Sequence, residues 1–292
     1  MHAPFRQFWR HHLDMLEIEL ARARRERPHP LDEASRPRGM PRDQHTGEHG
    51  TPSPPDGDSP TIIRSGPMTE NLATTTGRAT RTLLMCGAVA GPLYIVVVLL
   101  QLLTRDGFDI SRHPASMLSN GDQGWIQIAN FVVSGLLFVA GAIGLHRERG
   151  PAGWAGTWGP QLVGVCGAGM VAAAFFSADP ADGFPPGTPL GPPTDMSTHA
   201  MVHFLVSGIA FLALIAASFA FGRRFAAAGQ RGWAAFSMAT GALFLAAWIS
   251  IFAIQGSRVV NVAFALAVAL ALAWASLLAA YRPARPGAAV RR

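Results

Sequence analysis

Six long runs of apolar residues, separated by short polar segments, dominate residues 83–281 of this 292-residue chain. Their approximate limits are Leu83–Leu103, Ile126–Leu145, Gln161–Phe176, Ala200–Phe221, Trp233–Ile254 and Val259–Tyr281. No run contains Asp, Glu, Arg or Lys, and most are long enough to cross a hydrocarbon core of about 30 Å at about 1.5 Å per residue. Because backbone groups cannot stay unpaired in lipid, each run must be helical. The pattern predicts an all-α, polytopic membrane protein, a bundle of six transmembrane helices.

The two ends of the chain have a different character. Residues 1–27 predict an amphipathic helix, because apolar side chains recur every three to four residues, at Phe5, Trp9, Leu13, Leu16 and Leu20. Proline, glycine and polar residues then predict a disordered linker over residues 28–82, and residues 282–292 form a basic C-terminal tail. Since Met68 resembles a natural start, we hypothesise that residues 1–67 are a dispensable or misassigned extension.

Arginines near the ends of the runs predict the topology. One side of the bundle has eleven and the other has three. The first set is Arg78, Arg81, Arg147, Arg149, Arg223, Arg224, Arg231, Arg282, Arg285, Arg291 and Arg292, and the second is Arg105, Arg112 and Arg258. Because cytoplasmic loops carry the positive excess, both termini are predicted to be cytoplasmic. The same rule explains the net charge of +6 without a nucleic-acid partner.

The missing charges count against an ion pump or an ion-coupled transporter. An ion pump or ion-coupled transporter usually keeps an ionisable residue at mid-membrane depth, and none of the runs has an acidic or basic residue there. Uncharged groups such as Asn130 and Ser207 more often bond a neighbouring helix than a substrate. Cys86 and Cys166 lie inside apolar runs and predict neither a disulfide framework nor a reactive thiol. Small residues every fourth position predict close helix packing, at Ala263, Ala267, Ala271, Ala275 and Ala279 and at Gly164, Ala168 and Ala172.

Polar groups gather in the two loops predicted to face outside. The set that we call the outer cap consists of Arg112, His113, Ser116, Asp179, Asp182, His199 and His203. The second loop has carboxylates but no Arg or Lys, so Arg112 and His113 are candidate partners that would tie the two loops together. The alternative is that the carboxylates are simply solvated in a proline-rich turn.

A metal site is one interpretation of the histidines. His199 and His203 are four residues apart at the start of a predicted helix, so their rings share a face and could bind a divalent metal with Asp179 as third ligand. The alternative is that these histidines bond loop carbonyls or aspartates. Ser116 and Ser119 share a loop with His113, but no nucleophile elbow accompanies them.

The layout resembles a known family. The segment His113-Pro114-Ala115-Ser116-Met117-Leu118, the loop-shaping residues Gly121, Gly124 and Trp125, the pair Asp179-Pro180 and the histidines His199 and His203 are similar to the bacterial membrane family called domain of unknown function 998. The resemblance implies a multi-pass protein of the bacterial cytoplasmic membrane. It supplies no substrate, cofactor or catalytic residue.

The leading hypothesis is a non-enzymatic membrane protein whose outer cap binds a lipid headgroup, a small molecule or a partner protein. It depends on the missing charges at depth and on the lack of a complete catalytic set. The first alternative is a membrane-embedded, metal-dependent hydrolase of lipid or envelope substrates that uses His199, His203 and Asp179. The second is an uncoupled permease. The oligomeric state stays open.

Overall fold

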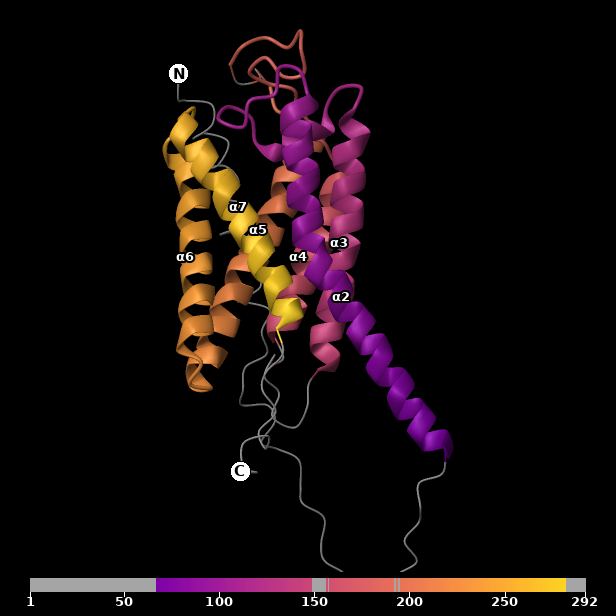
Figure 1. Cartoon of the computed structure of the whole chain (residues 1–292). Helices are drawn as coiled ribbons and strands as arrows, with labels where there is room; N and C mark the ends of the chain where they lie inside the picture. Colours follow the sequence, from indigo (N-terminus) through magenta and orange to yellow (C-terminus); the bar gives the residue numbers. More distant parts are fainter. Residues whose placement is uncertain (1–66, 149–155, 157, 192, 194, 282–292) are drawn as a thin grey trace, which may run out of the picture. The chain divides into compact units, whose positions relative to one another are not determined.

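A computed structural model describes residues 67–148, 156, 158–191, 193 and 195–281. The chain divides into two compact units, Met1–Ile62 and Ile63–Arg292. The first unit lies outside the described residues, as do the predicted helix over residues 1–27 and the basic tail over residues 282–292. The helices of the second unit are labelled in Figure 1.

The described residues form α-helices, one short 3₁₀ helix and no strand. The elements are α2 (Pro67–Thr104), η1 (Ala115–Ser119), α3 (Gly124–Arg147), α4 (Trp158–Ala174), α5 (Thr198–Ala227), α6 (Arg231–Ala253) and α7 (Arg258–Ala280). Five helices are long and apolar enough to cross a membrane, and α4 is a shorter apolar helix of 17 residues. The all-α class and the position of every apolar run are therefore confirmed, with five helices of spanning length where six were expected.

The start of α2 corrects one boundary. This helix begins at Pro67, so residues 67–82, which were expected to belong to the linker, are helical. Proline fits the first turn of a helix, and the next proline of this helix is Pro92. The apolar run beginning at Leu83 marked where the helix becomes fully apolar, whereas the helix itself starts earlier.

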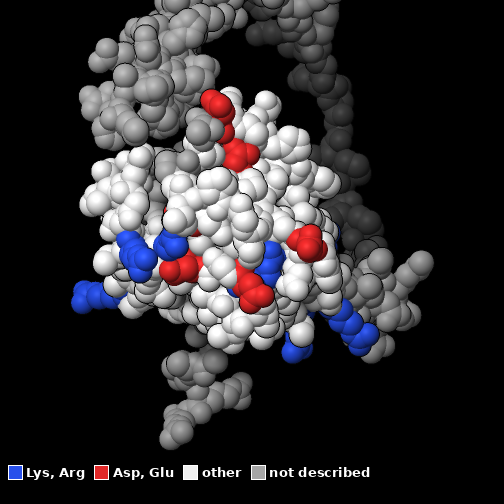
Figure 2. Space-filling model, turned by 90° about the horizontal axis from the view of Figure 1, so that it is seen from above, with Lys and Arg blue, Asp and Glu red and all other residues white. Residues whose placement is uncertain are grey.

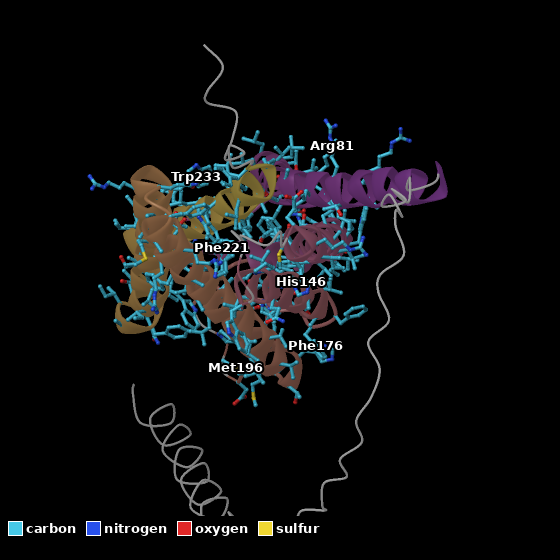
Figure 3. The ribbon with its side chains drawn as sticks, turned by 90° about the horizontal axis from the view of Figure 1, so that it is seen from below. Arg81, His146, Phe176, Met196, Phe221 and Trp233 are labelled. Carbon is cyan, nitrogen blue, oxygen red and sulfur yellow. The ribbon has the colours of Figure 1, made fainter. Side chains whose placement is uncertain are left out.

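The six helices form a closed ring in which each one packs against the next, and α7 returns to pack against α2. Successive helices run in opposite directions, so the α2–α3, α4–α5 and α6–α7 connections lie at one end (Figure 1). We call this the cap end and the opposite one the far end. Aromatic side chains pack across the ring between α5 and α7, where Phe221, labelled in Figure 3, contacts Trp274 with ring centroids 6.0 Å apart.

Glycines bring α3 close to both of its neighbours. A Cβ on Gly141 would lie 2.5 Å from the Cα of Gly87 in α2, and a Cβ on Gly167 in α4 would lie 2.6 Å from the carbonyl oxygen of Gly135. Such close contacts allow van der Waals attraction between the helix backbones. This attraction matters in a membrane, because the hydrophobic effect does not drive helices together in lipid. On α7 the predicted small-residue face is largely confirmed, because its buried members are Ala267, Ala271, Ala275 and Ala279. On α4 it is wrong in part, since Ala168 is exposed and Gly167 makes the close contact.

Candidate functional site

Residues 105–123, 175–191, 193 and 195–197 fold together at the cap end, and we call them the cap. They enclose a small apolar core of their own, made of Met117, Leu118, Ala178 and Phe184. On the surface above it, acidic and basic side chains lie among uncharged ones (Figure 2). The two loops therefore form one folded assembly.

The guanidinium of Arg112 joins the two loops. Its Nη2 donates to Oδ1 of Asp182 over 2.7 Å, and its Nε donates to Oδ2 over 2.9 Å. This fork geometry is the strongest form of a carboxylate pair. The hydrogen bond from Arg112 is the largest cause that lowers the pKa of Asp182, and the hydrogen bond from the backbone N–H of Gly191 is the next. The hydrogen bond between Arg112 and Asp182 also raises the pKa of Arg112. The predicted pairing of the second loop's carboxylates with Arg112 is confirmed at Asp182.

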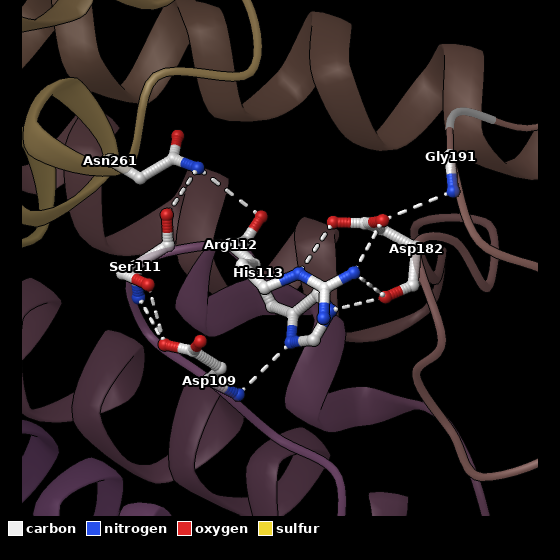
Figure 4. A network of polar contacts seen from close by, with 7 residues as sticks. All are labelled: Asp109, Ser111, Arg112, His113, Asp182, Gly191 and Asn261. Atoms are coloured by element: carbon white, nitrogen blue, oxygen red, sulfur yellow. Dashed lines mark hydrogen bonds and ion pairs between the residues drawn. The ribbon is translucent and has the colours of Figure 1, made fainter.

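His113 lies beneath this pair with both ring nitrogens engaged (Figure 4). Its Nδ1 accepts from the backbone N–H of Asp109 over 3.0 Å. Because an amide N–H can only donate, the proton of the neutral ring must be on Nε2, which donates to the carbonyl oxygen of Asp182 over 3.0 Å. The side chain is 1% exposed and packs beside Phe108 and Phe184. His113 therefore holds the two loops together through backbone groups.

Asp109 and Asn261 extend the network. The carboxylate of Asp109 accepts from the N–H and the hydroxyl of Ser111, over 2.9 and 2.7 Å, and the hydroxyl contact is the largest cause of its lowered pKa. From the first turn of α7, Asn261 donates to the carbonyl oxygens of Ser111 and Arg112, over 3.0 and 3.2 Å. The cap is thereby bonded to α7 as well.

Arg105 supports the cap from below. This residue directly follows α2 and is buried, and its guanidinium donates to the carbonyl oxygens of Leu118 and Asn120. It also lies over the ring of Phe184, 5.3 Å from the centroid, in a cation–π contact. Desolvation lowers the pKa of Arg105. In the sequence Arg105 indicated only topology, and nothing there marks its partners, because both are backbone carbonyls.

The other predicted members of the outer cap lie apart from this network. Asp179 accepts from the backbone N–H of Ser197 over 2.8 Å. His199 is exposed beside Phe176, with ring centroids 5.6 Å apart. Ser116 contributes its carbonyl oxygen, which accepts from the hydroxyl of Ser119. The proposed single cluster therefore separates into the Arg112–Asp182 network and a group of isolated contacts.

His203, in the second turn of α5, is buried within the bundle. It is 2% exposed, and its Nδ1 donates to the carbonyl oxygen of Phe176 over 2.8 Å. Its Nε2 lies 3.5 Å from the hydroxyl of Ser207, at the limit of a hydrogen bond. The interpretation that a histidine of this pair bonds a loop carbonyl is confirmed for His203.

The expected metal ligands do not come together. In the part of the chain that the structure describes, no group of three or more His, Cys, Asp or Glu residues is placed to hold a metal ion. Of the expected set, Asp179 is bonded to a backbone amide, His199 is exposed and His203 is bonded to a carbonyl. The side chains expected to bind the metal are therefore hydrogen-bonded elsewhere or exposed to solvent.

The loop-shaping residues fit their expected role. Gly121 has φ +76°, and a Cβ there would lie 3.2 Å from Pro185 of the other loop. At Gly124 a Cβ would lie 2.1 Å from the carbonyl oxygen of Ser119, which leaves no space for a side chain. Trp125 follows at the first turn of α3 and is 66% exposed, as an anchor at the membrane interface should be.

Comparison with known families places this architecture. A family described as protein of unknown function (DUF998) matches residues 88–281. The chain belongs to the DUF998 family. A search of curated proteins and a search of solved structures gave no match. The DUF998 segment runs from within α2 to the residue after α7, so it contains the whole cap, Asn261 and the polar residues of all the cap contacts.

Proposed function

We propose that this DUF998 protein is a binding protein of the bacterial cytoplasmic membrane and not an enzyme, with a cap that binds a lipid headgroup. In this proposal α4 is the sixth span, both termini are cytoplasmic and the cap faces outside. The topology is supported by the described arginines, of which six lie near the far end and three near the cap end. The first set is Arg78, Arg81, Arg147, Arg223, Arg224 and Arg231, and the second is Arg105, Arg112 and Arg258.

The observation that carries the proposal is the state of His113. A catalytic histidine needs a ring nitrogen free to exchange a proton with a substrate or nucleophile. In His113 one nitrogen accepts from the amide of Asp109 and the other donates to the carbonyl of Asp182. Proton transfer through this ring would break a contact that holds the cap together. The arrangement therefore favours a rigid binding platform.

The position of the cap favours a headgroup as ligand. It lies at the ends of apolar helices, at the level where lipid headgroups begin. Arg258, at the start of α7, is exposed and close enough to Asp109 to influence its pKa. An exposed arginine at a helix N-terminus attracts the phosphate of a headgroup. A small molecule and a partner protein are the other ligand classes. Among the described residues, no group of His, Cys, Asp and Glu side chains favours the metal-dependent hydrolase.

Lipid analysis of the purified protein tests the proposal. The full chain would be purified in native nanodiscs as wild type, as Arg258→Gln and as Arg231→Gln, a matched change of an exposed arginine at the start of α6. Enrichment of one anionic lipid class over the bulk membrane, reduced several-fold by Arg258→Gln and unchanged by Arg231→Gln, is expected. No enrichment in the wild type, or turnover of added lipid, would contradict the proposal.

A further inference from the structure

A row of uncharged polar side chains lies between α2 and α3, starting one turn below the cap. Its members are Tyr94 and Gln101 on α2 and Gln127, Asn130 and Ser134 on α3, and all five are buried. Nε2 of Gln101 donates to Oε1 of Gln127 over 2.8 Å, and Nε2 of Gln127 donates to the hydroxyl of Tyr94 over 3.3 Å. Of these residues Asn130 stood out in the sequence, and its connection with Gln127 and Gln101 becomes visible in the structure.

Two backbone carbonyls fix the direction of every amide in this row. The carbonyl oxygen of Tyr94 can only accept, so the atom of Asn130 facing it is Nδ2, at 3.2 Å. Nδ2 of Asn130 also donates to Gln127, which must therefore present Oε1 there. Oε1 of Gln127 also accepts a hydrogen bond from Gln101, so the atom of Gln101 that faces it must be Nε2. The carbonyl of Val97 requires the same orientation, because Nε2 of Gln101 donates to it over 3.4 Å.

The consequence is one acceptor without a partner. Oε1 of Gln101 is buried and has no hydrogen bond in the described structure, and the residue is 2% exposed. Turning the amide over would not help, because the amino group would then lose both of its acceptors. A buried acceptor that stays unpaired costs free energy, more so away from water. No donor among the described residues reaches this oxygen, which leaves it open to a donor from outside the chain.

The charges nearby determine which donor fits. The row contains no Asp or Glu that could balance a cation. The charged residue nearest to Gln101 in the sequence is Arg105, four residues later and directly after α2, and its guanidinium repels a second cation. A neutral hydroxyl meets the need without a charge penalty, whereas an ammonium group does not.

We infer that Oε1 of Gln101 is the acceptor of a binding site for one neutral hydroxyl group, set between α2 and α3 beneath the cap. The hydroxyl belongs to a water molecule or to the polar end of a lipid, and both supply the same O–H donor. The site is separate from the proposed headgroup site and stands without it.

A structure of the purified full chain in lipid nanodiscs, at a resolution that shows ordered water, tests this inference. A density peak within about 3 Å of Oε1 is expected. An isolated peak would identify water, and a peak continuous with an elongated density would identify a lipid hydroxyl. Absence of a peak in the wild type would overturn the inference.

Two variants sharpen the result. Gln101→Met keeps the length of the side chain and removes the acceptor, so the peak should be lost. Thr104→Val removes a hydroxyl from an exposed position one turn away on the same helix, so the peak should remain. A peak that persists in Gln101→Met would overturn the assignment to Oε1, and the wild-type density decides the matter if that variant does not fold.

Discussion

The guanidinium of Arg112 and the carboxylate of Asp182, 70 residues apart in the chain, meet in a fork of two hydrogen bonds that joins the two loops of the cap. Replacing either charge should loosen both loops, because Gly191 and His113 also bond to Asp182. The side chains are 30% and 33% exposed, so solvent screens part of the attraction. We expect Asp182→Asn to lower the free energy of unfolding by about 1 kcal/mol, and Arg112→Gln to lower it as well.

The measurement is hydrogen exchange of residues 109–113 and 181–191, together with thermal unfolding in detergent. Asp182→Asn is the suitable change, since Asp182 has φ +50° and asparagine tolerates this conformation. The far-end variant Arg231→Gln serves as control. Unchanged exchange in both cap variants would show that the fork contributes nothing to holding the loops.

The lowered pKa values of Asp109 and Asp182 predict that acid loosens the cap. A carboxyl whose folded pKa lies below its unfolded value of about 3.9 stabilises the fold at higher pH. That contribution is fully present above about pH 3.9 and is lost as the pH falls through the lower folded values. Proteolysis of the cap between pH 6 and pH 3 should therefore accelerate at the acid end.

The pH effect has its own control. Asp182→Asn cannot release or take up a proton at this position, so its cap should be weaker at neutral pH and should change less with acid than the wild type. An identical acid response in both proteins would assign the effect to other carboxyls.

Hydropathy predicted the helices well because lipid imposes one simple requirement on every span. The six apolar runs correspond to α2 through α7. The predicted start of α2 was wrong, because the helix extends on its N-terminal side beyond the apolar part. The pairing of Arg112 with Asp182 could also be predicted, because the second loop has carboxylates but no Arg or Lys of its own.

Other parts of the site depend on distances that a sequence does not contain. Arg105 bonds carbonyls, and every residue has a carbonyl, so its partners leave no mark in the sequence. Gln101 and Gln127 are 26 residues apart and pair only because glycines bring α2 and α3 together. The described residues do not bring the expected metal ligands together, for a related reason. The spacing of His199 and His203 places them near each other on one helix, but their rings have different surroundings.

Gly124→Ala should disrupt the entry into α3. A methyl group there would lie 2.1 Å from the carbonyl oxygen of Ser119, so the backbone must move. We expect a loss of about 1–3 kcal/mol, as for other overpacked sites. Gly232→Ala is the matched control, because a Cβ at that helical position meets nothing within 4 Å. Thermal unfolding of both variants measures the difference, and equal midpoints would contradict the tight turn.

Single cysteines test which end of the bundle faces outside. Leu190 in the cap is 78% exposed, and Ala228 is exposed in the far-end connection between α5 and α6. In a background with Cys86 and Cys166 replaced by alanine, Leu190→Cys should react with an impermeant thiol reagent in intact cells. Ala228→Cys should react only after the membrane is permeabilised. The arginine excess at the far end predicts this result, and the reverse labelling would place the cap in the cytoplasm and remove its proposed role at the outer surface.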